Sequence, residues 1–357
     1  MHNYDMERQR TRIMFNLQGD TKRKRGDPQA FARRATAFFG KEPLPQERII
    51  KNYTGKTLQG HKGKYLVEEK IGEGAVGVVY KGRKFVDKLA LGDEVAIKIG
   101  MKDPTITNRF RAEALYLTQL DHPSILKCYD YFEDTEVAYL VTELLKGDVL
   151  SNILNEMRIS IKDAVQVGLL ILEALEEIHG TGLVHRDLKP DNIFICEDGT
   201  LRIIDFGVSR IEGGVGYGHT TAGVTMGTPE YMSPEQIASS NVDAKADLYS
   251  FGIILYELLT GTVPFKSDNP DEKTRSLEIR VQQVEKIPEP VKKYNETVSK
   301  ELEGVTLRLL SKDKNRRYNS AAEVREDLHR LRDAELLEVT PDTRSPGRRL
   351  VDKLLGR

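Results

Sequence analysis

The stretch that decides the fold is HRDLKPDN, residues 185–192, and it is followed by DFG at residues 205–207. Upstream of it the chain carries VAIK, which ends at Lys98, and before that a GxGxxG loop. Each motif alone has an ordinary explanation, because an aspartate in a loop usually caps a helix or closes a turn. All of them together, in this order, are a highly specific combination and predict a site that handles phosphate.

The glycines of the loop are Gly72, Gly74 and Gly77. A loop without side chains allows backbone amides to approach phosphate oxygens closely. A dinucleotide site would need a helix directly after the glycines, whereas residues 78–80 are Val, Val and Tyr, which favour a strand. The sequence therefore predicts a phosphate-covering hairpin between two strands.

Lys98 stands in an apolar, strand-like run, EVAIKIG. An unpaired charge is expensive to bury in such a strand, so we expect the lysine to have an anionic partner. Glu113, on the helix expected near residues 107–120, is the candidate. Short strand-like runs dominate up to residue 144 and helical patterns dominate after residue 147, which predicts a small β-rich lobe followed by a larger helical one.

Together these motifs resemble those of the eukaryotic-type (Hanks-type) serine/threonine protein kinases. The resemblance runs from about residue 65 to residue 333, and the strings GTPEYMSPEQ and KPDNIFI are similar to bacterial members. It implies an α+β, bilobal fold that binds ATP and Mg²⁺, or Mn²⁺ in its place, between the lobes. The activity implied is transfer of the γ-phosphate of ATP to Ser or Thr hydroxyls of protein substrates.

By this resemblance, Lys98 paired with Glu113 holds the α and β phosphates of ATP. Asn192 and Asp205 bind Mg²⁺, a hard cation that prefers oxygen ligands. Phosphoryl transfer explains why such groups must converge, because the reaction needs positioning and charge neutralisation more than covalent work by the protein.

The resemblance also assigns residues on the acceptor side. Asp187 orients and deprotonates the acceptor hydroxyl, and Lys189 offsets negative charge on the transferred phosphoryl group. Thr228, in the substrate-docking segment GTPEYMSPE, contacts both of them and favours Ser and Thr hydroxyls. Lysine at position 189 is typical of Ser/Thr kinases, and the segment ends in SPE at residues 233–235 where the family usually has APE.

The adenine is expected between apolar walls, with backbone groups of residues 143–145 forming the hinge that joins the lobes. Thr142 stands at the back of this pocket. The residues implied for ATP binding, besides Lys98, are Ile71, Gly72, Glu73, Gly74, Gly77, Val79, Ala96, Thr142, Glu143, Leu145 and Phe194.

Between DFG and SPE lies a glycine-rich activation segment with several hydroxyls. Arg186 precedes Asp187, an arrangement that in the family pairs with a phosphate on this segment and orders it. We therefore predict autophosphorylation at Thr220, Thr221 or Thr225, with ordinary solvated threonines as the alternative.

Other residues are expected to be structural. His185 packs beneath Phe206 of DFG, in an apolar stack for which Leu117 and Cys128 are further candidates. Glu235 pairs with an arginine late in the chain, and Arg317 is a better match than Arg316. Asp247 anchors the catalytic loop, HRDLKPDN at residues 185–192, through the backbone of that loop.

The resemblance and the charge pattern divide the chain into segments. Residues 1–62 hold 14 Lys or Arg against 6 Asp or Glu, so they are interpreted as a basic extension with no sustained strand. Residues 63–333 are the kinase domain, with the first lobe at about 63–145 and the second at about 146–333. Residues 334–357 form a C-terminal tail.

Each extension contains one candidate amphipathic helix. The first begins at Asp27, which can cap it, with Pro28 in its first turn. Its apolar face carries Phe31, Ala35, Phe38 and Phe39. The helix in the tail has a face of Leu350, Val351, Leu354 and Leu355. Each face either packs on the kinase domain or binds a partner or a membrane surface.

The composition excludes several classes of protein. A formal net charge of -1 over 357 residues argues against a surface that binds nucleic acid. The 2 cysteines, Cys128 and Cys196, exclude a disulfide scaffold and a Cys-based zinc cluster. No apolar run reaches the roughly 18 residues of a membrane span, and residues 1–12 lack the apolar core of a secretory signal. We expect a cytoplasmic protein, and its oligomeric state is left open.

Two other classes of function compete with an active protein kinase. A pseudokinase would keep the fold as a binding module, but it normally lacks a catalytic Lys, Asp or Asn, and all of them are present here. A kinase of small molecules would lack Lys189 and the peptide-docking segment. An assay of phosphate transfer from ATP to protein separates the three.

Overall fold

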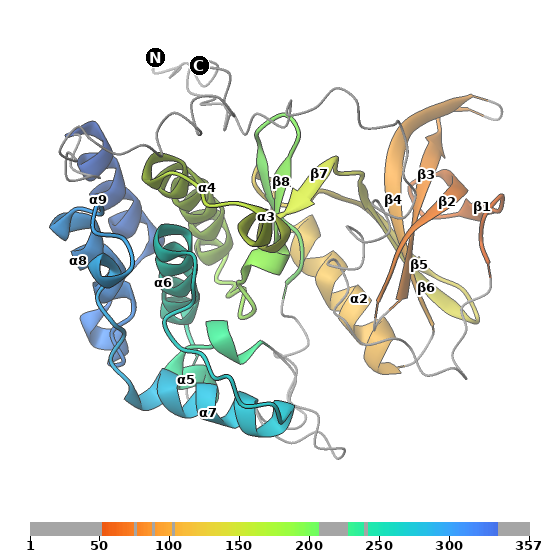
Figure 1. The fold of residues 1–357 in the computed structure, drawn as a ribbon. Helices are drawn as coiled ribbons and strands as arrows, with labels where there is room; N and C mark the ends of the chain where they lie inside the picture. The colour runs from red at the N-terminus through yellow and green to blue at the C-terminus, as the bar shows by residue number, and fades with distance from the viewer. Residues whose placement is uncertain are drawn as a thin grey trace.

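The computed structural model describes residues 52–74, 77–87, 90–101, 104–206, 228–238 and 242–334. A β-sheet with one helix beside it forms the first lobe, and a mostly helical body forms the second (Figure 1). This arrangement confirms the bilobal α+β fold that the sequence predicted. Among the described residues, no helix has the length and apolar character to cross a membrane.

The sheet of the first lobe has six strands in the order β1-β2-β3-β4-β6-β5, and all its pairs are antiparallel. In β4 the side chains of Val95, Ile97 and Ile99 are buried in the core of the lobe, and Lys98 alternates with them. Period-two alternation therefore turns Lys98 to the other face of the sheet. The strands are β1 (Thr57–Gln59), β2 (Lys64–Gly74), β3 (Gly77–Phe85), β4 (Leu91–Met101), β5 (Cys128–Glu133) and β6 (Val137–Glu143).

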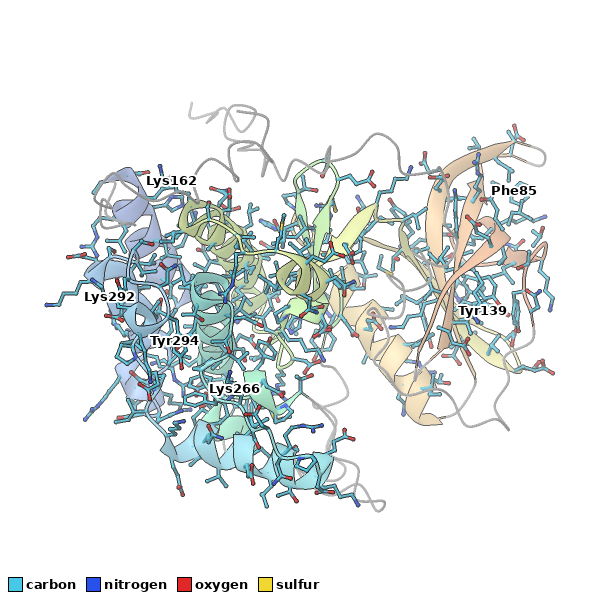
Figure 2. The ribbon with its side chains drawn as sticks, viewed as in Figure 1. Phe85, Tyr139, Lys162, Lys266, Lys292 and Tyr294 are labelled. Carbon is cyan, nitrogen blue, oxygen red and sulfur yellow. The ribbon has the colours of Figure 1, made fainter. Side chains whose placement is uncertain are left out.

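Aromatic rings fill the core of this lobe. The rings of Phe132 and Tyr139 stack with their centroids 4.7 Å apart, and Tyr53 meets Tyr139 edge to face at 6.0 Å. Tyr139 is labelled within the sheet in Figure 2. Aromatic pairs in such geometries contribute beyond the apolar area they bury.

The first lobe also includes residues that precede position 63, where the sequence placed its start. Strand β1 pairs with β2, and Leu58 and Tyr53 are buried in the same core. Leu58 is the one buried side chain of this three-residue strand, so the segment has no apolar pattern of its own. The expectation that residues 1–62 contain no sustained strand therefore overlooked a short one.

The second lobe is built around α6, whose residues are buried on almost every side. Helix α4 packs against α6 and α9, and serine or aspartate side chains cap the first turns of α4, α6, α8 and α9. The predominance of helices after residue 147 was expected from the sequence. The helices are α3 (Leu150–Glu156), α4 (Ile161–Gly180), α5 (Pro234–Ile237), α6 (Ala244–Thr260), α7 (Glu272–Glu285), α8 (Lys300–Leu309) and α9 (Ala321–Asp333).

The loops that carry the polar motifs lie between the two lobes. Helix α2 (Pro104–Thr118) packs beside β4, β5 and β6 of the first lobe. In the second lobe β7 (Gly147–Val149) precedes α3 and α4, whereas β8 (Ile193–Cys196) and β9 (Leu201–Ile203) follow them, and the three strands form a small antiparallel sheet. HRDLKPDN connects α4 to β8 and ends in the short helix η1 (Pro190–Asn192), and DFG follows β9. Both motifs are thereby held at the side of the second lobe that meets α2 (Figure 1).

Candidate active site

Lys98 of β4 and Glu113 of α2 form an ion pair, with the lysine Nζ 3.0 Å from the glutamate Oε2. Their side chains are 13% and 6% exposed, and the ammonium also lies 5.1 Å above the ring of Phe110. The structure therefore brings together the two residues that the resemblance paired. Removing either partner would leave the other charge buried, which typically costs about 3–5 kcal/mol.

The catalytic loop is anchored by Asp247 in the first turn of α6. Its carboxylate accepts hydrogen bonds from the backbone amides of His185 and Arg186, each at 2.8 Å, and it lies 2.9 Å from His179 Nε2. Burial alone would raise the pKa of Asp247, but the bonds from His179 and the Arg186 amide outweigh it and hold the pKa below its usual range. The carboxylate therefore stays ionised and fixes the loop to α4 and α6.

Asp187, Lys189 and Thr228 converge at one point. Lys189 Nζ lies 3.3 Å from Asp187 Oδ2 and donates to Thr228 Oγ1 at 3.3 Å. Asn192 donates from Nδ2 to the Asp187 carbonyl at 2.8 Å and to its carboxylate at 3.2 Å. A carboxylate, an ammonium and a hydroxyl are thus held together from the catalytic loop and the docking segment.

Asp205 follows β9 on the same side of the second lobe. Burial raises its pKa to about 7; the nearby carboxylates of Glu113 and Asp187 also raise it, while Lys98 and Lys189 lower it. Charged side chains of both lobes therefore shift the pKa of Asp205. Asn192 turns its amide nitrogen to Asp187, so its amide oxygen is the atom that can accept a cation. One carboxylate and one amide oxygen fit a Mg²⁺ ion whose other ligands come from phosphates and water.

An apolar cluster stands where the adenine was expected. Ile71 and Val79 pack with Ala96 and Leu144. Leu144 was not on the predicted set of nucleotide-binding side chains, although its backbone lies within the predicted hinge. Phe194 of β8 is buried in the core of the second lobe.

Side chains at the hinge form hydrogen bonds to neighbouring segments. Thr142 Oγ1 donates to the Glu143 carbonyl at 3.2 Å. The Glu143 carboxylate accepts from Arg202 Nε at 3.1 Å and from the Lys127 amide at 2.9 Å. Leu145 packs against the core of the second lobe. Glu143 therefore joins the hinge to β9, the strand that leads to Asp205.

The glycine motif forms the predicted hairpin, because β2 and β3 flank it and Gly74 pairs with Gly77. A Cβ at Gly77 would stand 2.3 Å from the Ile99 carbonyl oxygen, which no side chain can do without displacing the backbone. Gly72 pairs with Val79 and is buried, whereas Glu73 is exposed. The close approach to β4 accounts for the last glycine of the motif.

Phe206 links the two lobes through a ring stack. Its centroid lies 4.9 Å from that of His185 and 6.2 Å from that of Tyr116 on α2. Leu117 is buried in the same cluster, and Cys128 packs at its edge. Tyr116 was missed in the sequence, where no local pattern distinguishes it from the neighbouring Leu117.

The docking segment is held to the second lobe by buried polar side chains. Glu235 and Arg317 form a two-pronged ion pair with distances of 2.6 and 2.8 Å. Gln283 of α7 donates to the Pro229 carbonyl at 3.2 Å, and Gln236 of α5 donates to the Arg186 carbonyl at 2.8 Å. Neither glutamine was expected from the sequence.

Several sequence predictions fall outside the described residues. These are the candidate phosphorylation sites Thr220, Thr221 and Thr225, the glycine of DFG, and the amphipathic helices of both extensions. They remain predictions.

The residues of this site all lie within the part of the chain that is similar to known proteins. Residues 65–328 match the family model described as a protein kinase domain. The chain is 33% identical over 287 residues to a probable serine/threonine-protein kinase of Streptomyces coelicolor, covering 78% of this chain and 41% of that protein. It is 35% identical over 281 residues to the serine/threonine-protein kinase PknB of Mycobacterium tuberculosis, covering 76% and 43%. The chain thus spans about two fifths of the length of these curated relatives.

Proposed function

This chain belongs to the protein kinase family, and from that premise we propose that it is an active serine/threonine kinase that uses ATP. The observation that carries the proposal is the convergence of Asp187, Lys189 and Thr228. In this arrangement Asp187 accepts the proton of a substrate hydroxyl, and Lys189 offsets charge on the phosphoryl group as it is transferred.

The nucleotide side of the reaction is assigned to both lobes. The Lys98 ammonium, kept in place by Glu113, binds the α and β phosphates, and the Ile71, Val79 and Ala96 side chains cover the adenine. Mg²⁺ is expected on Asn192 and Asp205, where it would neutralise phosphate charge. A divalent cation also favours the ionised form of Asp205, against the burial that raises its pKa.

Lys189 and Thr228 support the choice of Ser and Thr over other acceptors. Lys189 Nζ donates to Thr228 Oγ1 at 3.3 Å, which places a small hydroxyl side chain beside the lysine that contacts Asp187. Protein substrates are proposed because the docking segment is present from Thr228 to Glu235 and is held to the catalytic loop through Gln236 and to α7 through Gln283.

Autophosphorylation in the activation segment is part of the same proposal. Arg186, next to Asp187, is the basic residue expected to pair with a phosphate on Thr220, Thr221 or Thr225. Mapping of phosphosites on the protein after incubation with ATP tests this point. Modification of none of the three threonines would remove it.

Transfer of radiolabelled phosphate tests the central claim. The protein is incubated with labelled ATP and Mg²⁺ or Mn²⁺, alone and with a generic basic protein, and the labelled amino acids are identified. Phosphoserine or phosphothreonine is expected from the wild type and is expected to be lost in Asp187→Asn. Asp198→Asn, in the exposed turn between β8 and β9, is the matched control and should stay active. No transfer with either metal would instead favour a binding module.

A further inference from the structure

The peptide that joins Arg186 to Asp187 has an unusual backbone. Arg186 has a φ of 65°, and among the described residues it is the one non-glycine residue with φ in the left-handed region. An L-residue other than glycine or asparagine rarely adopts this conformation, and it persists where surrounding groups hold it. The residue that follows is Asp187, so the direction of its carboxylate depends on this peptide.

The peptide groups around Arg186 are held from two sides. Asp247 accepts a hydrogen bond from the Arg186 amide at 2.8 Å, and Gln236 Nε2 donates to the Arg186 carbonyl at 2.8 Å. Both holding side chains are 1% exposed. Asp247 belongs to the anchoring already described, whereas Gln236 comes from α5, fifty positions further along the chain.

The oxygen of the Gln236 side-chain amide is bound to the docking segment. This Oε1 atom accepts from the Ser233 backbone amide at 3.0 Å, while the backbone amide of Gln236 donates to Ser233 Oγ at 3.3 Å. These two bonds form the capping box of α5. A glutamate at position 236 could complete that box equally well, but its ionised carboxylate could not donate to the Arg186 carbonyl.

We propose that Gln236 is a positioning residue for Asp187. The Arg186 carbonyl and the Asp187 amide belong to one peptide plane. Gln236 holds that plane by the carbonyl oxygen, and the Asp187 amide donates to His185 Nδ1 at 3.3 Å, so Gln236 helps to set the orientation from which the Asp187 side chain leaves the backbone. Because the same amide binds Ser233, it also couples the docking segment to Asp187. This inference rests on the proposed kinase activity.

Three variants of the full chain test the proposal. Gln236→Glu keeps the acceptor for the Ser233 amide and loses the donor to Arg186, and Gln236→Met loses both. Ser320→Ala removes the N-cap of α9, whose hydroxyl accepts from the Glu323 backbone amide at 3.2 Å, so it is the control for loss of a helix cap away from the site. For each variant, kcat, the KM for ATP and the thermal midpoint are measured, with kinetics well below the lowest midpoint.

The expected result is a fall in kcat of about tenfold or more in both Gln236 variants, with the KM for ATP within about twofold of wild type. Ser320→Ala should lower the thermal midpoint but keep kcat within about twofold. Wild-type kcat in Gln236→Met would overturn the inference while leaving the proposed function intact. An equal loss of kcat in Ser320→Ala would also overturn it, because lost stability alone would then explain the effect. A wild-type protein that transfers no phosphate would overturn both.

Discussion

Replacing Arg317 with lysine should strongly destabilise the protein although the charge is kept. The guanidinium side chain is 0% exposed, and each of its five N–H donors has an acceptor. Nε donates to the Ser311 carbonyl at 2.8 Å; Nη1 donates to Glu235 at 2.6 Å and to the Lys245 carbonyl at 2.9 Å; Nη2 donates to Glu235 at 2.8 Å and to the Lys312 carbonyl at 3.3 Å.

The magnitude follows from counting donors. A lysine ammonium carries three N–H donors on one nitrogen, so at least two of the five acceptors around it would lose their partner. Each buried polar group left without a hydrogen bond costs about 1–3 kcal/mol, so two of them give a loss of about 2–6 kcal/mol. This is a large part of the free energy of unfolding of a typical domain.

Urea unfolding of the wild type, Arg317→Lys and Arg316→Lys at one pH measures the effect. Arg316 is the matched control, because it is the preceding residue, its side chain is 81% exposed, and its contact with Asp313 is 3.8 Å long. We expect Arg316→Lys to change the free energy of unfolding by less than about 0.5 kcal/mol. The reasoning would be refuted if Arg317→Lys were as stable as Arg316→Lys.

Three further predictions concern Lys98 and Gly77 in the first lobe and Lys312 in the second. Lys98→Met should abolish phosphate transfer and lower the free energy of unfolding by about 3 kcal/mol, because it leaves the Glu113 carboxylate buried without its partner. Adding Glu113→Gln to this variant should restore part of the free energy of unfolding, measured with urea, but none of the activity. Gly77→Ala should raise the KM for ATP severalfold in steady-state kinetics, because its Cβ would displace the Ile99 carbonyl and with it the hairpin. Burial lowers the pKa of Lys312 to about 7, so between pH 7 and the ordinary lysine value the unfolded chain binds more protons than the folded one. The free energy of unfolding of the wild type minus that of Lys312→Met should therefore rise by up to about 2 kcal/mol between pH 7 and pH 9. A difference that stays flat or falls, measured by urea unfolding, would contradict this.

The parts of the site that the sequence predicted are those whose chemistry fixes the residue type. A lysine in an apolar strand needs an anion, and the structure places Glu113 beside Lys98. The order of motifs also indicated the two lobes, because strand alternation and helical periodicity extend over many residues in each.

The parts that the sequence did not predict depend on contacts between distant segments. Gln236 and Gln283 are polar residues in short or exposed helices, and nothing around them in the sequence distinguishes a buried amide from a solvated one. Their partners, the Arg186 and Pro229 carbonyls, lie fifty or more positions away. Strand β1 was missed for a related reason, because it is three residues long and owes its place to β2 and to the ring of Tyr53.

The anchoring of the catalytic loop by Asp247 has a consequence for movement. Asp187 lies on the loop that Asp247 of α6 holds, and Thr228 Oγ1 accepts from Lys189 of the same loop, whereas Lys98 and Glu113 belong to β4 and α2. A swing of one lobe about the hinge would therefore alter the gap between Lys98 and Asp187 and leave Asp187 in register with Thr228. Under the proposed function, binding of the nucleotide and alignment of the acceptor hydroxyl are then separate degrees of freedom, so a rotation of the lobes that releases the spent nucleotide need not disturb the contacts of Lys189 with Asp187 and Thr228.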